Sequence, residues 1–230
     1  MKRDVSHPNV AQTTRALMEI FESLHAAYGP QQWWPADSNE EVVIGAILTQ
    51  NTAWTNVEKA IAELKRADCL TFRAIDALDE IALAELIRSA GTFRQKATYL
   101  KAFARWLVEN HDGELDAALS GELDVVRGEL LALKGIGPET ADAILLYAGG
   151  HPTFVVDAYA KRVLRRHYLI EPKQTRYEKV RALFMDALPH DVRLFDEYHA
   201  LLVEVAKRHC KSTANCDGCP LAHFEHDGHL

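Results

Sequence analysis

Apolar side chains recur along the chain at steps of three and four residues, which is the spacing of one face of an α-helix. The first such stripe runs from Leu17 to Tyr28 and ends at the helix-breaking pair Gly29-Pro30. Similar stripes span residues 57–64, 93–107, 141–148 and 177–187. Only the run 153–156 has a β-like composition, and it is too short to found a sheet. The pattern therefore predicts an all-α fold with short connections.

Turn-rich stretches divide these predicted helices into groups. Glycine and proline cluster at residues 29–38 and again at residues 149–152, where the apolar pattern is interrupted. We therefore expect two helical lobes with a crevice between them. One lobe would run continuously from 39 to 148, and the other would combine 1–38 with 149–230.

Charge limits the ways in which the protein can bind its partners. The 230 residues include 26 lysines and arginines against 33 aspartates and glutamates, which gives a formal net charge of −7. This balance excludes a protein that holds nucleic acid through bulk positive charge, so any nucleic-acid site must be local. No apolar run approaches the roughly 18 residues of a membrane helix, and no secretory signal is recognisable, so we expect a cytoplasmic protein.

The motif with the clearest chemical meaning is LKGIGPETADAIL at residues 133–145. We expect a helix to end near Leu133, and a second helix to begin at Pro138, where a proline in the first turn is well tolerated. The unpaired amides of that second helix can hold a phosphate without basic side chains. Such a hairpin would reconcile DNA binding with a negative net charge. An isolated Gly-x-Gly, however, more often makes only a tight turn.

An acidic residue follows the hairpin at the start of another predicted helix. Val155-Val156 leads into Asp157, whose carboxylate could cap that helix or face a cleft. The next turns carry the basic residues Lys161, Arg162, Arg165 and Arg166. They form either a short basic strip for nucleic acid or a solvated helix face.

Together these motifs resemble the helix-hairpin-helix superfamily of DNA glycosylases, and in particular its endonuclease III branch. The resemblance extends to ILTQNTAWTNVEKAI at residues 47–61 and to IRSAGTFRQKATYL at residues 87–100, and the blocks occur in the same order. It implies a two-lobed helical fold, with the hairpin at the end of the continuous lobe. It also implies that double-stranded DNA containing a damaged base binds across the crevice, to a protein that acts as a monomer.

The resemblance assigns roles to individual residues. Asp157 takes the place of the catalytic aspartate, which stabilises positive charge on the sugar or polarises an attacking water. Gln50 takes the place of the side chain that fills the gap left by the flipped base, and its neighbour Asn51 is a candidate for DNA contact. Without the family, Gln50 would be read as a residue at a helix end that bonds a nearby carbonyl. The other candidates for DNA contact are Gly135, Ile136, Gly137, Glu139, Thr140, Lys161 and Arg162.

One departure from the family pattern concerns strand cleavage. In bifunctional members a lysine two residues after the second hairpin glycine forms a Schiff base with the sugar. Glu139 stands at that position here, and Lys134 lies before the hairpin. Because a carboxylate cannot form an imine, the resemblance implies a monofunctional glycosylase with little or no lyase activity.

The expected substrate depends on Trp33-Trp34-Pro35, which precedes the Gln50 segment. With the other motifs, this run resembles the 3-methyladenine DNA glycosylases of the endonuclease III scaffold, in which such tryptophans help form the base pocket. A cationic alkylated purine would stack well on indole rings. Equally, the tryptophans could plug the interface between the lobes, and Leu201 occupies the place of a pocket lysine of that branch.

Two alternatives to an alkylated-purine glycosylase remain open. The first is an endonuclease III-like enzyme for oxidised pyrimidines or for mispaired uracil or thymine. The second belongs to another class and is a DNA-structure binding protein that has lost catalysis, although the presence of Asp157 argues against it.

Three of the four cysteines, Cys210, Cys216 and Cys219, crowd the C-terminus, which suggests a metal or cluster in a reducing compartment. Cys69 stands apart, and we expect it to be a buried apolar residue. The C-terminal loop resembles the iron–sulfur loop of the endonuclease III family, with Glu225 in place of the fourth cysteine. Alternative ligands nearby are His223, His226 and His229. We expect a structural 4Fe-4S cluster with a non-standard or missing fourth ligand. A loop without metal is the second alternative, and a zinc site is the third.

Overall fold

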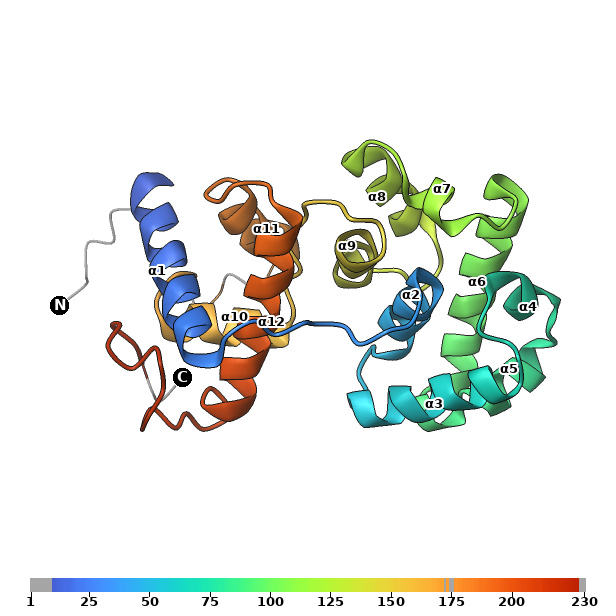
Figure 1. The fold of residues 1–230 in the computed structure, drawn as a ribbon, viewed down its shortest axis with the longest axis horizontal. Helices are drawn as coiled ribbons and strands as arrows, with labels where there is room; N and C mark the ends of the chain where they lie inside the picture. Colours follow the sequence, from blue (N-terminus) through green and yellow to red (C-terminus); the bar gives the residue numbers. More distant parts are fainter. Residues whose placement is uncertain (1–9, 172, 174–175, 228–230) are drawn as a thin grey trace. The chain divides into compact units, whose positions relative to one another are not determined.

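The computed structural model describes residues 10–171, 173 and 176–227, and Figure 1 shows their fold. The regular secondary structure of this part of the chain is helical, and its β-pairing is an isolated bridge between Cys210 and Ala214. The run 153–156 forms no strand. The predicted all-α fold is therefore confirmed. Within the described residues, no helix combines the length and the apolar character needed to span a membrane.

The chain divides into two compact units. Unit 1 combines the chain up to Trp33 with the chain from Pro152 onwards, and unit 2 is the continuous segment Trp34–His151. The sequence placed these divisions after residues 38 and 148, so the boundaries differ by a few residues. Trp33 and its neighbour Trp34 thus belong to different units.

Unit 2 is built around α2, in which every residue from Glu41 to Leu48 is buried. This helix packs against α3, α6, α7 and α9. The helical segments of unit 2 are α2 (Asn39–Leu48), α3 (Trp54–Arg66), α4 (Phe72–Ala77), α5 (Glu80–Leu86), the 3-10 turn η1 (Arg88–Ala90), α6 (Phe93–His111), α7 (Leu115–Leu119), α8 (Leu123–Ala132) and α9 (Pro138–Tyr147).

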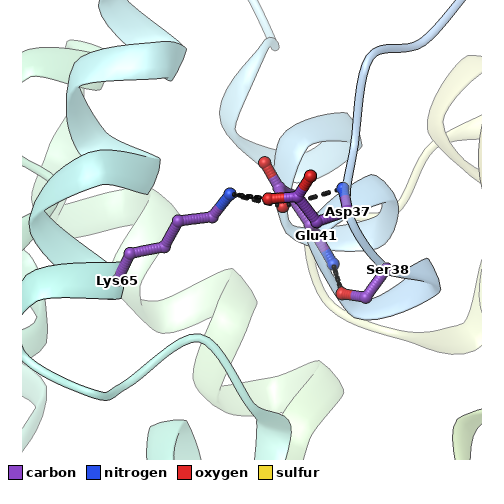
Figure 2. A network of polar contacts seen from close by, with 4 residues as sticks. All are labelled: Asp37, Ser38, Glu41 and Lys65. Atoms are coloured by element: carbon purple, nitrogen blue, oxygen red, sulfur yellow. Dashed lines mark hydrogen bonds and ion pairs between the residues drawn. The ribbon is translucent and has the colours of Figure 1, made fainter.

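A polar network, shown in Figure 2, fixes the start of α2. Ser38 Oγ accepts the Glu41 N–H at 3.2 Å, and Glu41 Oε2 accepts the Asp37 N–H at 3.1 Å. Lys65 of α3 lies 2.7 Å from Asp37 Oδ2 and 2.8 Å from Glu41 Oε2. Because the Glu41 side chain is only 8% exposed, Lys65 compensates its charge in place of water. The network holds α2 against α3, and thereby the turn after α2 that carries Gln50.

A buried lysine holds the other end of α2. Lys96 of α6 is 2% exposed, and its ammonium donates to the carbonyls of Leu48 at 2.8 Å and Ala90 at 2.7 Å. Burial lowers the pKa of Lys96. The carbonyls at the C-terminal end of a helix carry partial negative charge, which favours an ammonium group there.

Unit 1 is built around α12, which packs against α1 and α10. Its helices are α1 (Val10–Tyr28), α10 (Ala158–Arg166), α11 (Tyr177–Met185) and α12 (Val192–Arg208). Tyr198 is fully buried in α12, and its hydroxyl donates to the Leu17 carbonyl of α1 at 2.7 Å. The stripe predicted from Leu17 to Tyr28 is confirmed, since Ile20 and Leu24 are buried with Leu17.

The expectation that Cys69 is buried is wrong. Its side chain is half-buried, and its thiol donates to the Ala67 carbonyl at 3.2 Å in the turn after α3. The preceding residue, Asp68, has a φ of +54°, so the chain turns sharply at the surface there instead of entering the core.

Candidate functional site

The hairpin between α8 and α9 has two glycines with different functions. Gly135 has a φ of +87°, and a Cβ at this position would lie 2.1 Å from the Tyr99 ring of α6. Glycine is required there by the backbone conformation and by the packing of Tyr99. Gly137 has a φ of −91°, and a Cβ on it would meet open space. The protein itself therefore does not require a glycine at 137, and that position leaves room for a ligand.

The start of α9 presents backbone groups to this open space. Its N-cap, Gly137, has no side-chain cap, and Pro138 stands in the first turn. Ile136 is 5% exposed and its N–H donates to the Leu133 carbonyl at 3.1 Å, so this residue is held inside the hairpin. Glu139 is exposed in the first turn of α9, and Lys134 is exposed before the hairpin.

Gln50, in the turn after α2, is bonded to the hairpin. Its Nε2 donates to the Gly135 carbonyl at 2.9 Å and to Thr140 Oγ1 at 3.1 Å. Thr140 is only 7% exposed, so its hydroxyl serves the interior of unit 2. Asn51 follows with a φ of +53° and is exposed. In this conformation Gln50 therefore bonds a nearby carbonyl, as the alternative interpretation from sequence expected.

Asp157 is the N-cap of α10. Its Oδ1 accepts the Ala160 N–H at 2.7 Å, and its Oδ2 lies 3.7 Å from His199 Nε2 of α12. Burial on its own would raise the pKa of this carboxyl. The His199 imidazole and the amides of Ala160 and Tyr159 outweigh burial and lower the pKa below its usual range. Asp157 is therefore an ionised carboxylate at neutral pH, with a side chain only 16% exposed.

His199 is the main site residue that the sequence did not indicate. Its side chain is 6% exposed, and the Trp33 ring meets it edge-on, with 6.1 Å between ring centroids. The ammonium of Lys207, near the end of α12, lies 5.3 Å from the centroid of the Trp33 ring. Asp196 lies one turn before His199, and burial together with the charge of Glu197 raises the pKa of Asp196 to about 6. Unit 1 thus gathers an ionised carboxylate, an imidazole and an indole.

The two tryptophans that the sequence assigns to one pocket contact different residues. Trp33 touches His199 in unit 1. Trp34 belongs to unit 2, where its ring centroid lies 5.0 Å from that of Tyr147 and 5.4 Å from that of Trp54. Trp34 is therefore part of an aromatic cluster, and Trp33 is the tryptophan that lies beside the partner of Asp157.

The basic residues of α10 do not form a uniform solvated face. Arg166 is 2% exposed and donates to the Ser212 carbonyl at 3.1 Å. Arg162 donates to the Cys210 carbonyl. Both arginines therefore support the C-terminal cysteine loop. Lys161 is half-buried, with its ammonium over the ring of a tyrosine in α11.

The C-terminal loop brings thiols and imidazoles to one pocket. Its lining includes Cys210, Cys216, Cys219, His167, His209 and His226. In each histidine, Nδ1 lies 2.7–3.3 Å from a backbone carbonyl. That contact favours the tautomer with the proton on Nδ1 and leaves Nε2 for a metal. His223 is not among the lining residues, and His229 lies outside the described residues.

The side chains of this pocket are of the types that bind a cluster or a metal ion, but they are not arranged to bind one in this structure. Thiolates and imidazoles are the ligands of iron–sulfur clusters and of zinc. Among the described residues, however, no group of three His, Cys, Asp or Glu side chains is arranged so that it could hold a metal ion. Ligation would therefore require the loop to draw its side chains together.

Comparison with protein families and sequences places the chain among base excision repair proteins. The family model of the HhH-GPD superfamily base excision DNA repair protein matches residues 44–190. A protein of Methanocaldococcus jannaschii, provisionally named a DNA repair glycosylase, is 45% identical over 210 residues, which cover 90% of this chain and 94% of that protein. Endonuclease III of Thermotoga maritima is 29% identical over 185 residues, covering 77% of this chain and 78% of that protein.

Solved structures resemble the chain over most of its length. The H. pylori 3-methyladenine DNA glycosylase bound to 1,N6-ethenoadenine has a TM-score of 0.70 and 27% identity, covering 85% of this chain and 97% of that chain. A non-covalent endonuclease III–DNA complex has a TM-score of 0.80 and 22% identity, covering 94% and 96%, and shows the shared fold. With a family model that matches most of the chain and a relative at 45% identity, the protein belongs to the helix-hairpin-helix superfamily of DNA repair glycosylases.

Proposed function

We propose that the protein removes a damaged base from double-stranded DNA by hydrolysis, with Asp157 as the catalytic carboxylate. The observation that carries this proposal is the state of Asp157, a partly buried, ionised carboxylate that is held by the first turn of α10. As the bond between C1′ and the base breaks, its electron pair leaves with the base and positive charge develops on the sugar. A nearby carboxylate stabilises that charge, and it takes the proton of the water whose oxygen bonds to C1′.

An aspartate to asparagine substitution tests this role. Asp157→Asn keeps a side-chain cap on α10 but removes the charge, and we expect single-turnover base release to fall by at least about 100-fold. Asp191→Asn is the matched control, because Asp191 is the N-cap of α12 and accepts the Leu194 N–H at 2.8 Å, outside the site. Equal base release by Asp157→Asn and the parent would remove Asp157 from the mechanism. Tight DNA binding without release by either protein would favour a binding module.

Within this function, the hairpin is the proposed grip on the DNA backbone. The open space at Gly137 and the first-turn amides of α9 suit a phosphate oxygen. Gln50 is the proposed residue that enters the duplex, and Asn51 is a proposed DNA contact beside it. To do so, Gln50 would exchange its bonds to Gly135 and Thr140 for bonds to the orphaned base. Lys161 would add local positive charge.

The proposed reaction is monofunctional. Glu139 is exposed at the start of α9, at the position that the family resemblance gives to the Schiff-base lysine, and a carboxylate cannot form an imine. Duplexes carrying the excised lesion should therefore show strand breaks only after treatment with hot alkali. Strand breaks without alkali, or covalent trapping of the protein on DNA by borohydride, would contradict a monofunctional mechanism.

The proposed substrate is an alkylated purine such as 3-methyladenine. Support comes from Trp33, an aromatic face close to the Asp157 partner His199, and from the similarity to the H. pylori 3-methyladenine glycosylase. A cationic purine would gain cation–π stabilisation on an indole. The similarity to endonuclease III of T. maritima favours an oxidised or mispaired pyrimidine as the second candidate. A base-release screen over duplexes with each lesion separates the two.

We also propose a 4Fe-4S cluster in the C-terminal loop, with Cys210, Cys216 and Cys219 as ligands and a pocket histidine or no protein atom at the fourth iron. The thiols and the Nε2 atoms that line the pocket support this proposal. Hydrolysis transfers no electrons, so such a cluster would order the loop that Arg162 and Arg166 already bond. Iron analysis and visible absorbance of anaerobically purified protein test it, and a colourless, iron-free preparation would count against the cluster.

A further inference from the structure

The geometry points to His199 as a positioning residue for the reaction. We infer that its imidazole keeps the Asp157 carboxylate charged and correctly placed inside unit 1. This inference rests on the proposed function, because it concerns the same carboxylate. It begins from the 3.7 Å separation between Asp157 Oδ2 and His199 Nε2.

The two oxygens of Asp157 are held in different ways. Oδ1 accepts the Ala160 amide at 2.7 Å, which fixes it to the first turn of α10. Oδ2 faces His199 at a distance that is longer than a hydrogen bond but within the range of an ion pair. The imidazole is therefore within ion-pair distance of the carboxylate, and it attracts Oδ2 when its ring carries a proton on both nitrogens. Oδ2 is the oxygen better placed to serve a water or a developing sugar cation.

The burial of the pair makes this attraction strong. The side chains of Asp157 and His199 are only 16% and 6% exposed. In such surroundings the effective dielectric constant is low, so a charge at 3.7 Å matters more than it would at the surface. An isolated carboxylate buried to this degree would be driven towards its protonated form, which cannot stabilise a sugar cation. The pKa of Asp157 is nevertheless lowered, with His199 the leading cause that opposes burial.

Other charged groups also face His199. Asp196 lies one turn earlier on α12, and its pKa, raised to about 6 by burial, is partly lowered again by His199. Lys207, two turns later on α12, has its ammonium over the Trp33 ring, 5.3 Å from the ring centroid. Asp157 Oδ2 lies at ion-pair distance from His199, and the Trp33 ring meets the imidazole edge-on.

The first test follows the carboxyl group directly and requires no activity. Asp157 is titrated by carboxyl-carbon NMR in the parent, in His199→Gln and in His199→Phe. Glutamine keeps an N–H donor without a charge, and phenylalanine keeps a ring against Trp33 without a donor. We expect the midpoint of the Asp157 titration to move to higher pH in both variants, because the group that opposes burial is gone. An unchanged Asp157 titration in both variants would overturn the inference.

The matched control is His111→Gln in unit 2. His111 Nε2 lies 3.9 Å from Glu129 Oε2, and its ring meets the Trp106 ring edge-on with 4.7 Å between centroids. His111 therefore has a carboxylate and a tryptophan as neighbours, as His199 does, but in a more exposed place outside the site. This variant should leave the titration of Asp157 and the rate of base release at the parent values. Far-UV circular dichroism and thermal melting establish which His199 variants are folded, and either one suffices for the comparison.

The second test uses base release under single-turnover conditions across pH. We expect both His199 variants to lose about 10- to 100-fold in rate at neutral pH, as is common when the partner of a functional side chain is removed. The acidic limb of their rate profile should also move to higher pH. Lower rates with a parent-like acidic limb would mean that His199 serves packing alone, and would overturn the inference.

Failure of the proposed function gives a different result from failure of this inference. If Asp157→Asn releases the base as fast as the parent, the proposed function itself is wrong. If Asp157→Asn is inactive while His199→Gln and His199→Phe keep the parent rate and pH profile, only the role of His199 is rejected.

Discussion

At the scale of single residues, the hairpin glycines show how similar positions meet different requirements. Both glycines would let the backbone of the hairpin approach another group closely, but the sequence does not say which group that is. In the structure Gly135 makes room for Tyr99, which lies more than thirty positions earlier in the chain, whereas Gly137 faces open space. Only the fold reveals this difference, because it depends on a packing partner that no local pattern identifies.

An alanine pair separates the two functions. Gly135→Ala should destabilise the protein by about 2 to 4 kcal/mol, because the new Cβ would meet Tyr99 and the backbone φ is positive. Gly137→Ala should change stability little and weaken binding to a duplex, because its methyl group would project into the space proposed for the phosphate backbone. Urea unfolding and fluorescence anisotropy measure the two effects. Equal stability of the two variants, or unaltered DNA binding by Gly137→Ala, would contradict this assignment.

The site residue missed from the sequence is also instructive at this scale. Asp157 is recognisable because it follows a distinctive motif and begins a helix. His199 sits in the run YHALLV, where a single polar residue among apolar ones is the only local indication. Its function depends on a partner from α10, and contacts between segments far apart in the chain cannot be predicted from periodicity.

At the scale of helices, periodicity predicts several elements but misses α12. The stripes at 57–64 and 93–107 correspond to α3 and α6, because each of these helices has one buried and one solvated face. No stripe was recognised for α12, whose residues from Tyr198 to Val203 are all buried. The stripe at 141–148 nevertheless predicts α9, although the residues of α9 from Thr140 to Leu146 are also all buried.

The connection between helix α2 and the hairpin leads to a prediction at this scale. Gln50→Ala removes the amide that bonds Gly135 and Thr140, and should lower the free energy of unfolding by about 1 to 2 kcal/mol. It should also weaken binding to a duplex with an abasic site more than binding to an undamaged duplex. Asn110→Ala, which loses only a bond to Trp106 of its own helix, is the control. A stability loss with equal effects on both duplexes would limit Gln50 to holding the hairpin.

At the scale of the whole molecule, the sequence indicates the division of the chain better than it indicates the packing within each unit. Turn-rich stretches lie close to both points where the chain passes between units. Which helices then meet is decided by long-range packing, as for Tyr198 of α12 and the Leu17 carbonyl of α1. The packing of helices within each unit is therefore expected from the resemblance to known glycosylases and not from periodicity.

Stability of the whole molecule should depend on pH through Asp196. Its pKa rises from 3.8 in a model compound to about 6 in the folded protein. A group with a raised folded pKa contributes stability that is fully present below the unfolded pKa and is lost as pH rises through the folded value. Between about pH 4 and pH 6 the folded state therefore loses stability from this carboxyl, because it must ionise in a partly buried position.

Asp196→Asn removes this penalty without a large change in shape. After allowance for the solvent that still reaches the group, the variant should be more stable than the parent by about 1 kcal/mol at pH 7. The advantage should shrink below pH 4, where the parent carboxyl is protonated in both states. Urea unfolding at a series of pH values measures the difference. A difference that stays constant from pH 4 to pH 7 would show that the carboxyl ionises as easily in the folded protein as in the unfolded chain.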